Sequence, residues 1–259
     1  MRSRYRISMN GVQMDTIDDG LLILDIQHSE PEFAIIGNRN ANVDGYDYNA
    51  NEAYFLKTTV TVTFELHIYD IAKRNEACQK VNAWAQAGGS LRVNERSGQY
   101  LRWVRCARYA NIASARNWTD PLTLVFETTY VPYWTSTTDS TLTLTGKAPK
   151  GNLSVDGNTG NALVLATITA QANVTSIQIT AGSTTLKLTG LSMKNKDVME
   201  IDYVHSRYLR IRVNGKSVMG NLNASSSDLL TVPCGAKTAI AISASGKVKA
   251  AIRARGYWL

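Results

Sequence analysis

Histidine and cysteine are scarce in this chain of 259 residues, with three of each. They are also widely dispersed, at His28, His67, His205, Cys78, Cys106 and Cys234. No two of them have the spacing of a zinc motif such as CxxC, and three distant cysteines do not make a disulfide framework. We therefore expect no metal site and no cofactor, with the thiols packed as small apolar side chains.

Long apolar runs are absent as well. The chain contains no run of roughly eighteen apolar residues, the length that a membrane-spanning helix needs. The opening residues 1–15 are basic but lack the apolar core of a secretory signal. We expect no insertion into a membrane.

Motifs of catalysis are the third absence. The sequence has no GxSxG, no HExxH and no GxxxxGK[ST]. Glycoside hydrolysis needs two facing carboxylates, and the conceivable sets are Glu30 with Glu32, or Asp197, Glu200 and Asp202. Acidic residues on turns are common in any soluble chain, and none of the histidines has an evident partner as a base. We therefore expect that the protein is not an enzyme, and we assign no catalytic residue.

Charge is present but uneven. The net charge is +7, yet residues 1–134 contain 14 basic and 15 acidic residues, a net charge of −1. Residues 135–259 contain 14 basic and 6 acidic residues, a net charge of +8. A solvated basic face is the favoured interpretation, and contact with an anionic polymer, either nucleic acid or a cell-wall polymer, is the alternative. A plain nucleic-acid binder would also need basic and aromatic residues interleaved on a stacking surface, and the second half lacks that pattern.

The first half of the chain is organised around residues 58–68, where apolar and polar side chains alternate as in a half-buried strand. A helix should follow, with Asp70 as its N-cap and with Gly88 and Gly89 at its end. Its packed side should carry Ile71, Cys78, Val81, Trp84 and Ala85. Further strands are predicted at residues 4–11, 21–29, 90–93 and 122–131, with a hairpin over 91–106 that turns at 94–98.

The second half consists of short alternating runs separated by turns such as DGN, AGS and NGK. Asn214 and Gly215 suit a tight hairpin turn. Many short strands without a helix indicate an antiparallel sandwich or barrel, and we favour the sandwich. The predicted fold is therefore mainly β, with an N-terminal β-rich domain (residues 1–134) that contains one α-helix, followed by a C-terminal antiparallel β-sandwich (residues 135–259).

Two segments of the first half are candidates for contacts with a partner. The polar loop 37–53 has no periodicity, and it is either a surface loop or an arm that becomes ordered against a neighbouring subunit. Tyr46, Tyr48 and Tyr54 would be its aromatic anchors. Arg102 and Arg105 belong to an arginine cluster that forms either a solvated strand face or a partner contact.

Sugar binding is a further possibility for the second half. Such sites stack aromatic rings on the apolar face of a sugar. Tyr203, Tyr208 and Trp258 are the candidates, with Tyr257 beside them, although the last two can equally close the core of the final strand.

A family resemblance is carried by features along the whole chain. They are the early NG (Asn10, Gly11), the NRNANVDG stretch before YFLKTTVTVTFELHIYD, and the helix KRNEACQKVNAWAQAGG leading to SLRVNERSGQYLRWVRCARY. The ending DLLTVPCGAKTAIAISASGKVKAAIRARGYWL completes them. In these features the chain resembles the distal tail proteins of long-tailed phages with non-contractile tails (siphoviruses). It departs from them at Pro233 and Gly235, which Cys234 separates, and in lacking the usual Asn after the glycine.

The resemblance implies a structural protein of the virion, assembled in the host cytoplasm at the phage tail tip. Members form a hexameric ring through the first domain, and their second domain is a galectin-like or carbohydrate-binding-module-like sandwich. The ring connects the tail tube protein to the hub, which is the tail-associated lysin, and to the receptor-binding proteins, while DNA passes the lumen without specific binding. The loop with Arg39 and Asp44 would be the arm between subunits. The alternative function is a glycan-binding module that acts on host cell-wall polymer through the C-terminal sandwich.

Overall fold

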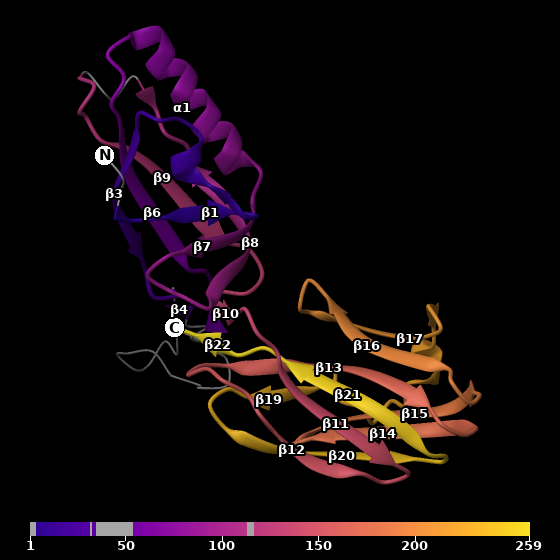
Figure 1. Ribbon diagram of the computed structural model, residues 1–259. Coiled ribbons are helices and arrows are strands. Elements are labelled where there is room, and N and C mark those ends of the chain that lie inside the picture. Colours follow the sequence, from indigo (N-terminus) through magenta and orange to yellow (C-terminus); the bar gives the residue numbers. More distant parts are fainter. Residues whose placement is uncertain (1–3, 32, 35–53, 113–116) are drawn as a thin grey trace, which may run out of the picture. The chain divides into compact units, whose positions relative to one another are not determined.

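The computed structural model of the protein describes residues 4–31, 33–34, 54–112 and 117–259. The chain divides into two compact units (Figure 1). Unit 1 comprises Met1–Trp134 together with Leu259, and unit 2 comprises Thr135–Trp258. Each unit is built on β-strands and has its own core, so the mainly β fold class predicted from the sequence is confirmed.

Unit 1 contains an antiparallel sheet with one helix (Figure 1). Its strands follow one another in the order β2 (Val12–Gln13), β1 (Ile7–Met9), β7 (Gly89–Val93), β8 (Gln99–Arg108), β9 (Leu122–Thr128), β6 (Thr59–Leu66) and β3 (Leu21–His28). A separate pair is formed by β4 (Phe33–Ala34) and β5 (Tyr54–Phe55), and η1 (Met14–Thr16) is a 3-10 turn. Strand β6 has the predicted alternation, because Val60, Val62 and Phe64 are fully buried while the threonines between them are only partly buried.

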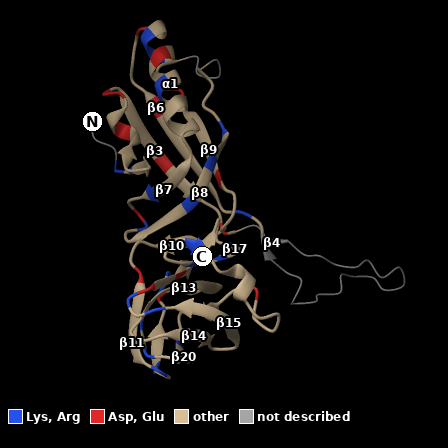
Figure 2. Cartoon of the chain, turned by 90° about the vertical axis from the view of Figure 1, so that its right-hand side faces the viewer, with Lys and Arg blue, Asp and Glu red and all other residues tan. Residues whose placement is uncertain are grey.

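Helix α1 (Ile71–Gln86) packs on the apolar side of this sheet through small side chains such as Ala77, Cys78 and Val81. Its other side carries basic and acidic residues (Figure 2). The predicted N-cap is confirmed, since the Asp70 carboxylate accepts hydrogen bonds from the backbone amides of the second and third helical residues. The prediction for Ile71 was wrong: its side chain is 71% exposed, because the first helical residue lies beyond the edge of the packed face.

Unit 2 is a sandwich of two antiparallel sheets, as predicted (Figure 1). The first sheet has the order β11 (Ser140–Gly146), β21 (Val248–Ala254), β13 (Asn161–Ala170), β16 (Val198–Val204), β17 (Tyr208–Val213) and β18 (Lys216–Ser217), with β19 (Thr231–Pro233) paired to β13. The second has the order β12 (Lys150–Ser154), β20 (Lys237–Ala244), β14 (Val174–Ala181) and β15 (Thr184–Met193). Apolar residues of both sheets, such as Ile168 and Ile179, form one buried core between them.

Smaller elements complete the chain. The short strands β10 (Trp134–Ser136) and β22 (Tyr257–Trp258) pair with each other, and η3 (Met219–Asn221) follows β18. Asn214 and Gly215 have φ angles of +49° and +80°, so the tight turn predicted at these residues is confirmed. Within the residues described, no helix combines the length and the apolar character needed to cross a membrane.

A polar cluster inside unit 1 surrounds Arg96, which lies in the turn between β7 and β8. Arg96 donates from Nε to Nε2 of His28 at 3.3 Å and from Nη1 to the carbonyl oxygen of Leu259 at 2.7 Å. Its guanidinium carbon also lies 5.0 Å from the ring centroid of the buried Trp134. His28 must be neutral at Nε2 to accept the bond from Arg96.

Lowering the pH is therefore expected to destabilise unit 1 through His28. Burial lowers the pKa of His28 from its ordinary value of 6.5, Arg96 lowers it further, and Glu95 acts in the opposite direction. Because the folded-state pKa lies below the unfolded-state pKa, the stabilisation is complete above pH 6.5 and is lost as the pH falls through the folded-state pKa. Thermal melts between about pH 5 and 7.5 should show that the melting temperature falls more steeply with decreasing pH in the wild type than in His28→Gln. Parallel profiles for the two proteins would contradict this prediction.

Candidate subunit-interface surfaces

The residues predicted from the sequence to contact a neighbouring subunit fall into two groups. Arg39, Asp44, Tyr46 and Tyr48 lie outside the described residues, and Tyr54 begins the short strand β5. Arg102 and Arg105 both lie in β8, near the end of strand β9. These two arginines belong to a surface that the geometry of β8 creates.

A β-bulge shapes that surface. Gly89 pairs with Val104 and Leu91 pairs with Leu101, so Arg102 and Trp103 together lie opposite a single residue of β7. Trp103 has a φ of +49°, a region in which a bulky residue is strained. A bulge changes the direction in which side chains point, and backbone strain of this kind is frequent at functional sites.

Aromatic and cationic side chains meet at the bulge. The guanidinium carbon of Arg102 lies 4.0 Å from the Trp103 ring centroid, and Trp103 makes an edge contact with Tyr130 at 5.6 Å. The backbone amide and hydroxyl of Thr129 both donate to the Trp103 carbonyl oxygen, at 3.1 and 2.7 Å, and hold the bulge against the end of β9. Tyr130 is 38% exposed, so its ring is available to a partner.

A shallow hollow lies beside the bulge. Its volume is about 630 Å³, and it is lined by Leu56, Lys57, Arg105, Glu127, Thr128, Thr129 and Tyr130. Lys57 pairs with Glu127 at 2.7 Å, and Arg105 approaches the same carboxylate at 3.8 Å. We call Leu56, Lys57, Arg102, Trp103, Arg105, Glu127 and Tyr130 the arginine–tryptophan surface. It has three cations and one carboxylate, so it is basic.

A second exposed aromatic group lies where β6 ends and α1 begins. Tyr69 is 85% exposed, and its ring lies 5.3 Å from that of Trp118. His67 makes an edge contact with Trp118 at 5.2 Å and pairs with Glu65 at 2.6 Å. We call His67, Tyr69, Ile71 and Trp118 the tyrosine–tryptophan surface. Glu65 pairs with His67 of this surface, Asp70 follows Tyr69 in the chain, Asp120 lies two residues after Trp118, and Lys73 lies two residues after Ile71.

The two surfaces lie at opposite ends of one strand pair. Strands β6 and β9 are antiparallel, with Thr59 opposite Glu127 and Phe64 opposite Leu122. The arginine–tryptophan surface lies where β6 begins and β9 ends, whereas the tyrosine–tryptophan surface lies where β6 ends and β9 is about to begin. A strand of eight residues separates its ends by about 25 Å. Unit 1 therefore has a basic aromatic surface at one end and an aromatic surface with neighbouring carboxylates at the other.

The aromatic residues predicted to bind sugar do not share one surface. Tyr203 pairs with Leu209 and Tyr208 pairs with Val204, so the two tyrosine side chains point to opposite faces of the sheet. The Tyr203 hydroxyl donates to the Leu230 carbonyl oxygen and accepts from the Leu230 amide, and burial raises the pKa of Tyr203 to about 12. Tyr208 is 67% exposed.

Trp258 lies in β22, which pairs with β10 rather than with the strands of the two tyrosines. A stacking platform made of all three aromatic residues therefore does not form within unit 2.

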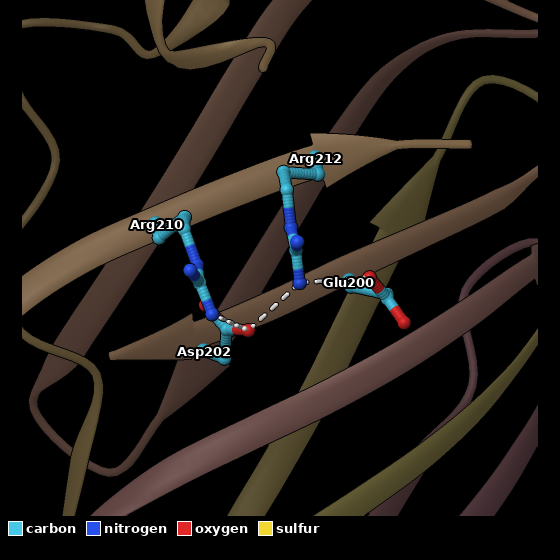
Figure 3. Close-up of polar contacts among 4 residues, drawn as sticks. All are labelled: Glu200, Asp202, Arg210 and Arg212. Carbon is cyan, nitrogen blue, oxygen red and sulfur yellow. Dashed lines mark hydrogen bonds and ion pairs between the residues drawn. The ribbon is translucent and has the colours of Figure 1, made fainter. Parts of the chain in front are cut away.

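Two of the carboxylates considered for catalysis, Glu200 and Asp202, are held in ion pairs (Figure 3). Asp202 accepts from Arg210 Nε and Nη2 at 2.6 and 2.8 Å and from Arg212 at 3.1 Å, and Arg212 also pairs with Glu200 at 3.1 Å. The hydrogen bond from Arg210 lowers the pKa of Asp202, and a backbone hydrogen bond lowers that of Asp197. A glycosidase acid needs a raised pKa, so these carboxylates have the wrong electrostatics for that role.

Metal binding has no support among the described residues. No group of three or more His, Cys, Asp or Glu side chains lies close enough together to hold a metal ion there. Of the predicted pair Glu30 and Glu32, the structure describes Glu30, and Glu32 lies outside the described residues.

The structure also adds residues that the sequence did not assign to a subunit interface. Trp103 and Tyr130 join the two arginines, and Tyr69, Ile71 and Trp118 form the second surface. The break in strand alternation at Tyr69, immediately before the N-cap, was the available signal for the second surface. The bulge at Trp103 left no signal in the sequence.

The two units, a β-rich unit with one helix followed by a β-sandwich, have the architecture that the resemblance implied. By sequence, no protein-family model and no curated protein matches the chain. Among solved structures it is similar to the Dit protein (gp 19.1) of phage SPP1, described as a paradigm of the hub adsorption apparatus in phages that infect Gram-positive bacteria. The TM-score is 0.73 and the identity 13%, over 97% of this chain and 98% of that chain.

Two chains of the phage P2 baseplate in its activated conformation, with Ca and with Sr, have lower TM-scores of 0.49 and 0.48. Their identities are 7% and 6%, and in each case 97% of both chains is covered. Of these three structures, the SPP1 protein is the one whose TM-score supports an argument about the fold. The resemblance to siphovirus distal tail proteins is thus confirmed at the level of the fold.

Proposed function

We propose that this protein is a non-enzymatic structural component of a phage tail tip, in which six copies form a ring through unit 1. The observation that carries the proposal is the likeness to the SPP1 hub protein along nearly the whole chain, both units included. The ring connects the tail tube to the hub and the adhesion apparatus, and the protein is part of the virion.

The two surfaces of unit 1 supply the contact between copies. The arginine–tryptophan surface of one copy docks on the tyrosine–tryptophan surface of the next, where Arg102 and Arg105 meet the neighbouring carboxylates. Because the two surfaces differ and lie at opposite ends of the β6–β9 pair, the contact is head-to-tail. Head-to-tail contacts make a ring when the rotation between neighbours closes. Tyr, Trp and Arg are also the residues that most often dominate binding energy at interfaces.

DNA passes the lumen of this ring without specific binding. Phosphate contacts with lysine and arginine bind nucleic acid tightly and in a salt-dependent way. The net charge of −1 over residues 1–134 avoids such retention, since unit 1 lines the ring. The ring has partners on both of its faces. The tail tube protein binds one face, and the hub or tail-associated lysin binds the other together with the receptor-binding proteins.

Native mass spectrometry of the purified protein tests the proposal. A ring of six 28.4 kDa chains has a mass of about 170 kDa, and negative-stain images should show particles with a central hole. A strict monomer at every concentration, and also in the presence of tail partners, would count against the ring.

A further inference from the structure

The charges of unit 2 are divided unequally between its two sheets. On the sheet that contains β16, β17 and β21, arginines are matched by carboxylates: Arg210 and Arg212 by Asp202, and Arg253 by Asp139 at 3.9 Å. The strands of the second sheet, β12, β14, β15 and β20, contain no Asp or Glu at all. The second sheet therefore carries positive charge alone, whereas the first sheet combines arginines with carboxylates.

Three lysines stand on the outer face of that second sheet. Lys150 is in β12, Lys187 in β15 and Lys237 in β20, and all three are exposed and form no ion pair within unit 2. Strands in a sheet are about 4.8 Å apart, so Lys150 and Lys187, on the two outermost strands, lie about 14 Å apart across the sheet. We call the outer face of this sheet the lysine face.

The floor between the lysines is made of small polar and alanine side chains. Across the strands, Lys150 is opposite Ala241, which is opposite Thr180, and Lys187 is opposite Gln178, which is opposite Ser243. A hollow of about 290 Å³ opens beside Lys187, on the side away from Lys150 and Lys237, and is lined by Ser176, Ile177, Gln178, Lys187, Leu188, Ser243, Ala244 and Ser245. Long lysine side chains thus rise above a low floor that is rich in hydroxyl groups.

We propose that the lysine face binds a phosphate-linked polyol polymer. Lysines that form no ion pair within unit 2 complement the repeated phosphates by charge. Serine, threonine and glutamine side chains on the floor can exchange hydrogen bonds with the polyol hydroxyls. The low floor leaves room for an extended chain to lie across the strands between the lysines.

The same face is poorly suited to nucleic acid and to sugar rings. None of β12, β14, β15 and β20 contains a Phe, Tyr or Trp, so no aromatic ring is available for stacking on bases or on pyranose faces. The inference goes beyond the proposed ring and does not depend on it, because every contact lies within unit 2 of one chain.

Fluorescence anisotropy with a labelled poly(glycerol phosphate) chain, at low salt and with the full-length protein, tests the proposal. The test protein carries Lys150→Gln, Lys187→Gln and Lys237→Gln. The matched control carries Lys194→Gln, Lys216→Gln and Lys249→Gln, three exposed lysines elsewhere in unit 2, so both triple variants lose the same net charge. If one lysine beside an anionic surface contributes about fivefold, the test protein should bind roughly a hundredfold more weakly and the control about as the wild type does.

A second measurement needs no variant. The polymer should protect Lys150, Lys187 and Lys237 of the wild type from acetylation while Lys249 remains reactive. Equal losses in the two triple variants, protection of the control lysine, or single-stranded DNA of equal charge binding as tightly as the polymer would each overturn the proposal. Absence of salt-sensitive binding by the wild-type protein would overturn it as well.

Discussion

Replacing Tyr69 by Ala together with Ile71 by Ser is expected to weaken self-association about a hundredfold, equivalent to roughly 3 kcal/mol. These two side chains are 85% and 71% exposed in the single chain, so their removal should leave the fold of unit 1 unchanged. Both lie on the tyrosine–tryptophan surface, where a partner would bury them. Sedimentation velocity over a range of protein concentrations measures the change.

A control of the same chemistry is available in unit 2. Tyr208 is 67% exposed and lies on neither surface, so Tyr208→Ala should assemble like the wild type. Equal loss of assembly in Tyr208→Ala and in the Tyr69→Ala, Ile71→Ser variant would remove the tyrosine–tryptophan surface from the interface without excluding a ring that forms by other contacts.

The head-to-tail geometry makes a sharper demand. A variant with Arg102→Glu and Arg105→Glu loses the arginine–tryptophan surface but retains the tyrosine–tryptophan surface. In a mixture with the Tyr69→Ala, Ile71→Ser variant, its intact tyrosine–tryptophan surface can bind the intact arginine–tryptophan surface of that variant. The other two surfaces of such a pair are both disrupted, so no further copy can bind. The mixture should therefore form dimers and stop there, whereas each variant alone stays monomeric. Dimers of either variant alone would point instead to a two-fold contact.

Local signals in the sequence were sufficient for much of the fold. Strand β6 and the cap at Asp70 were predicted because alternation and capping depend on residues that are neighbours in the chain. The turn at Asn214 and Gly215 was predictable for the same reason, since positive φ angles select these residue types. The sandwich in the second half followed from the number and spacing of its short strands.

The candidate surfaces required information that no local pattern contains. The bulge at Arg102 and Trp103 results from the register between β7 and β8, which side-chain alternation does not specify. Trp118 meets His67 and Tyr69 only because β9 lies beside β6 in the sheet, although helix α1 and two strands separate them in the chain. Sequence reasoning could therefore propose Arg102 and Arg105 but not the aromatic side chains around them.

The proposed sugar-binding residues show the same limit. Tyr203 and Tyr208 are close in sequence, and the sequence alone does not tell whether a turn between them keeps their side chains on one face. The register Tyr203 opposite Leu209 separates the two, and the backbone of Leu230 occupies the Tyr203 hydroxyl. The lysine face was similarly hidden, because its three lysines come from three different strands.

Gly256→Ala is expected to destabilise unit 2 by about 3 kcal/mol or more, because a Cβ at this position would overlap the backbone carbonyl oxygen of Asp156. Gly256 lies in the corner between β21 and β22, where other backbone segments also approach closely. Gly157 and Gly235 approach each other there with φ angles of +127° and +74°, and the carbonyl oxygen of Gly256 accepts a hydrogen bond from the Ser136 amide at 2.9 Å. Backbone atoms cannot move aside as the end of a flexible side chain can, so the added methyl group must shift the strands themselves.

Gly220→Ala is the matched control for this substitution. A Cβ at Gly220 would have no atom within 4 Å, and its φ is not in the left-handed region, so its effect on the free energy of unfolding should stay within about 0.5 kcal/mol. Gly256→Ala should lower the melting temperature of unit 2 by about 10 °C, and Gly220→Ala should change it very little. Thermal unfolding followed by circular dichroism measures both. Equal melting temperatures in the two variants would mean that the backbone at Asp156 can withdraw at little cost, and that the corner does not fix β22 in place.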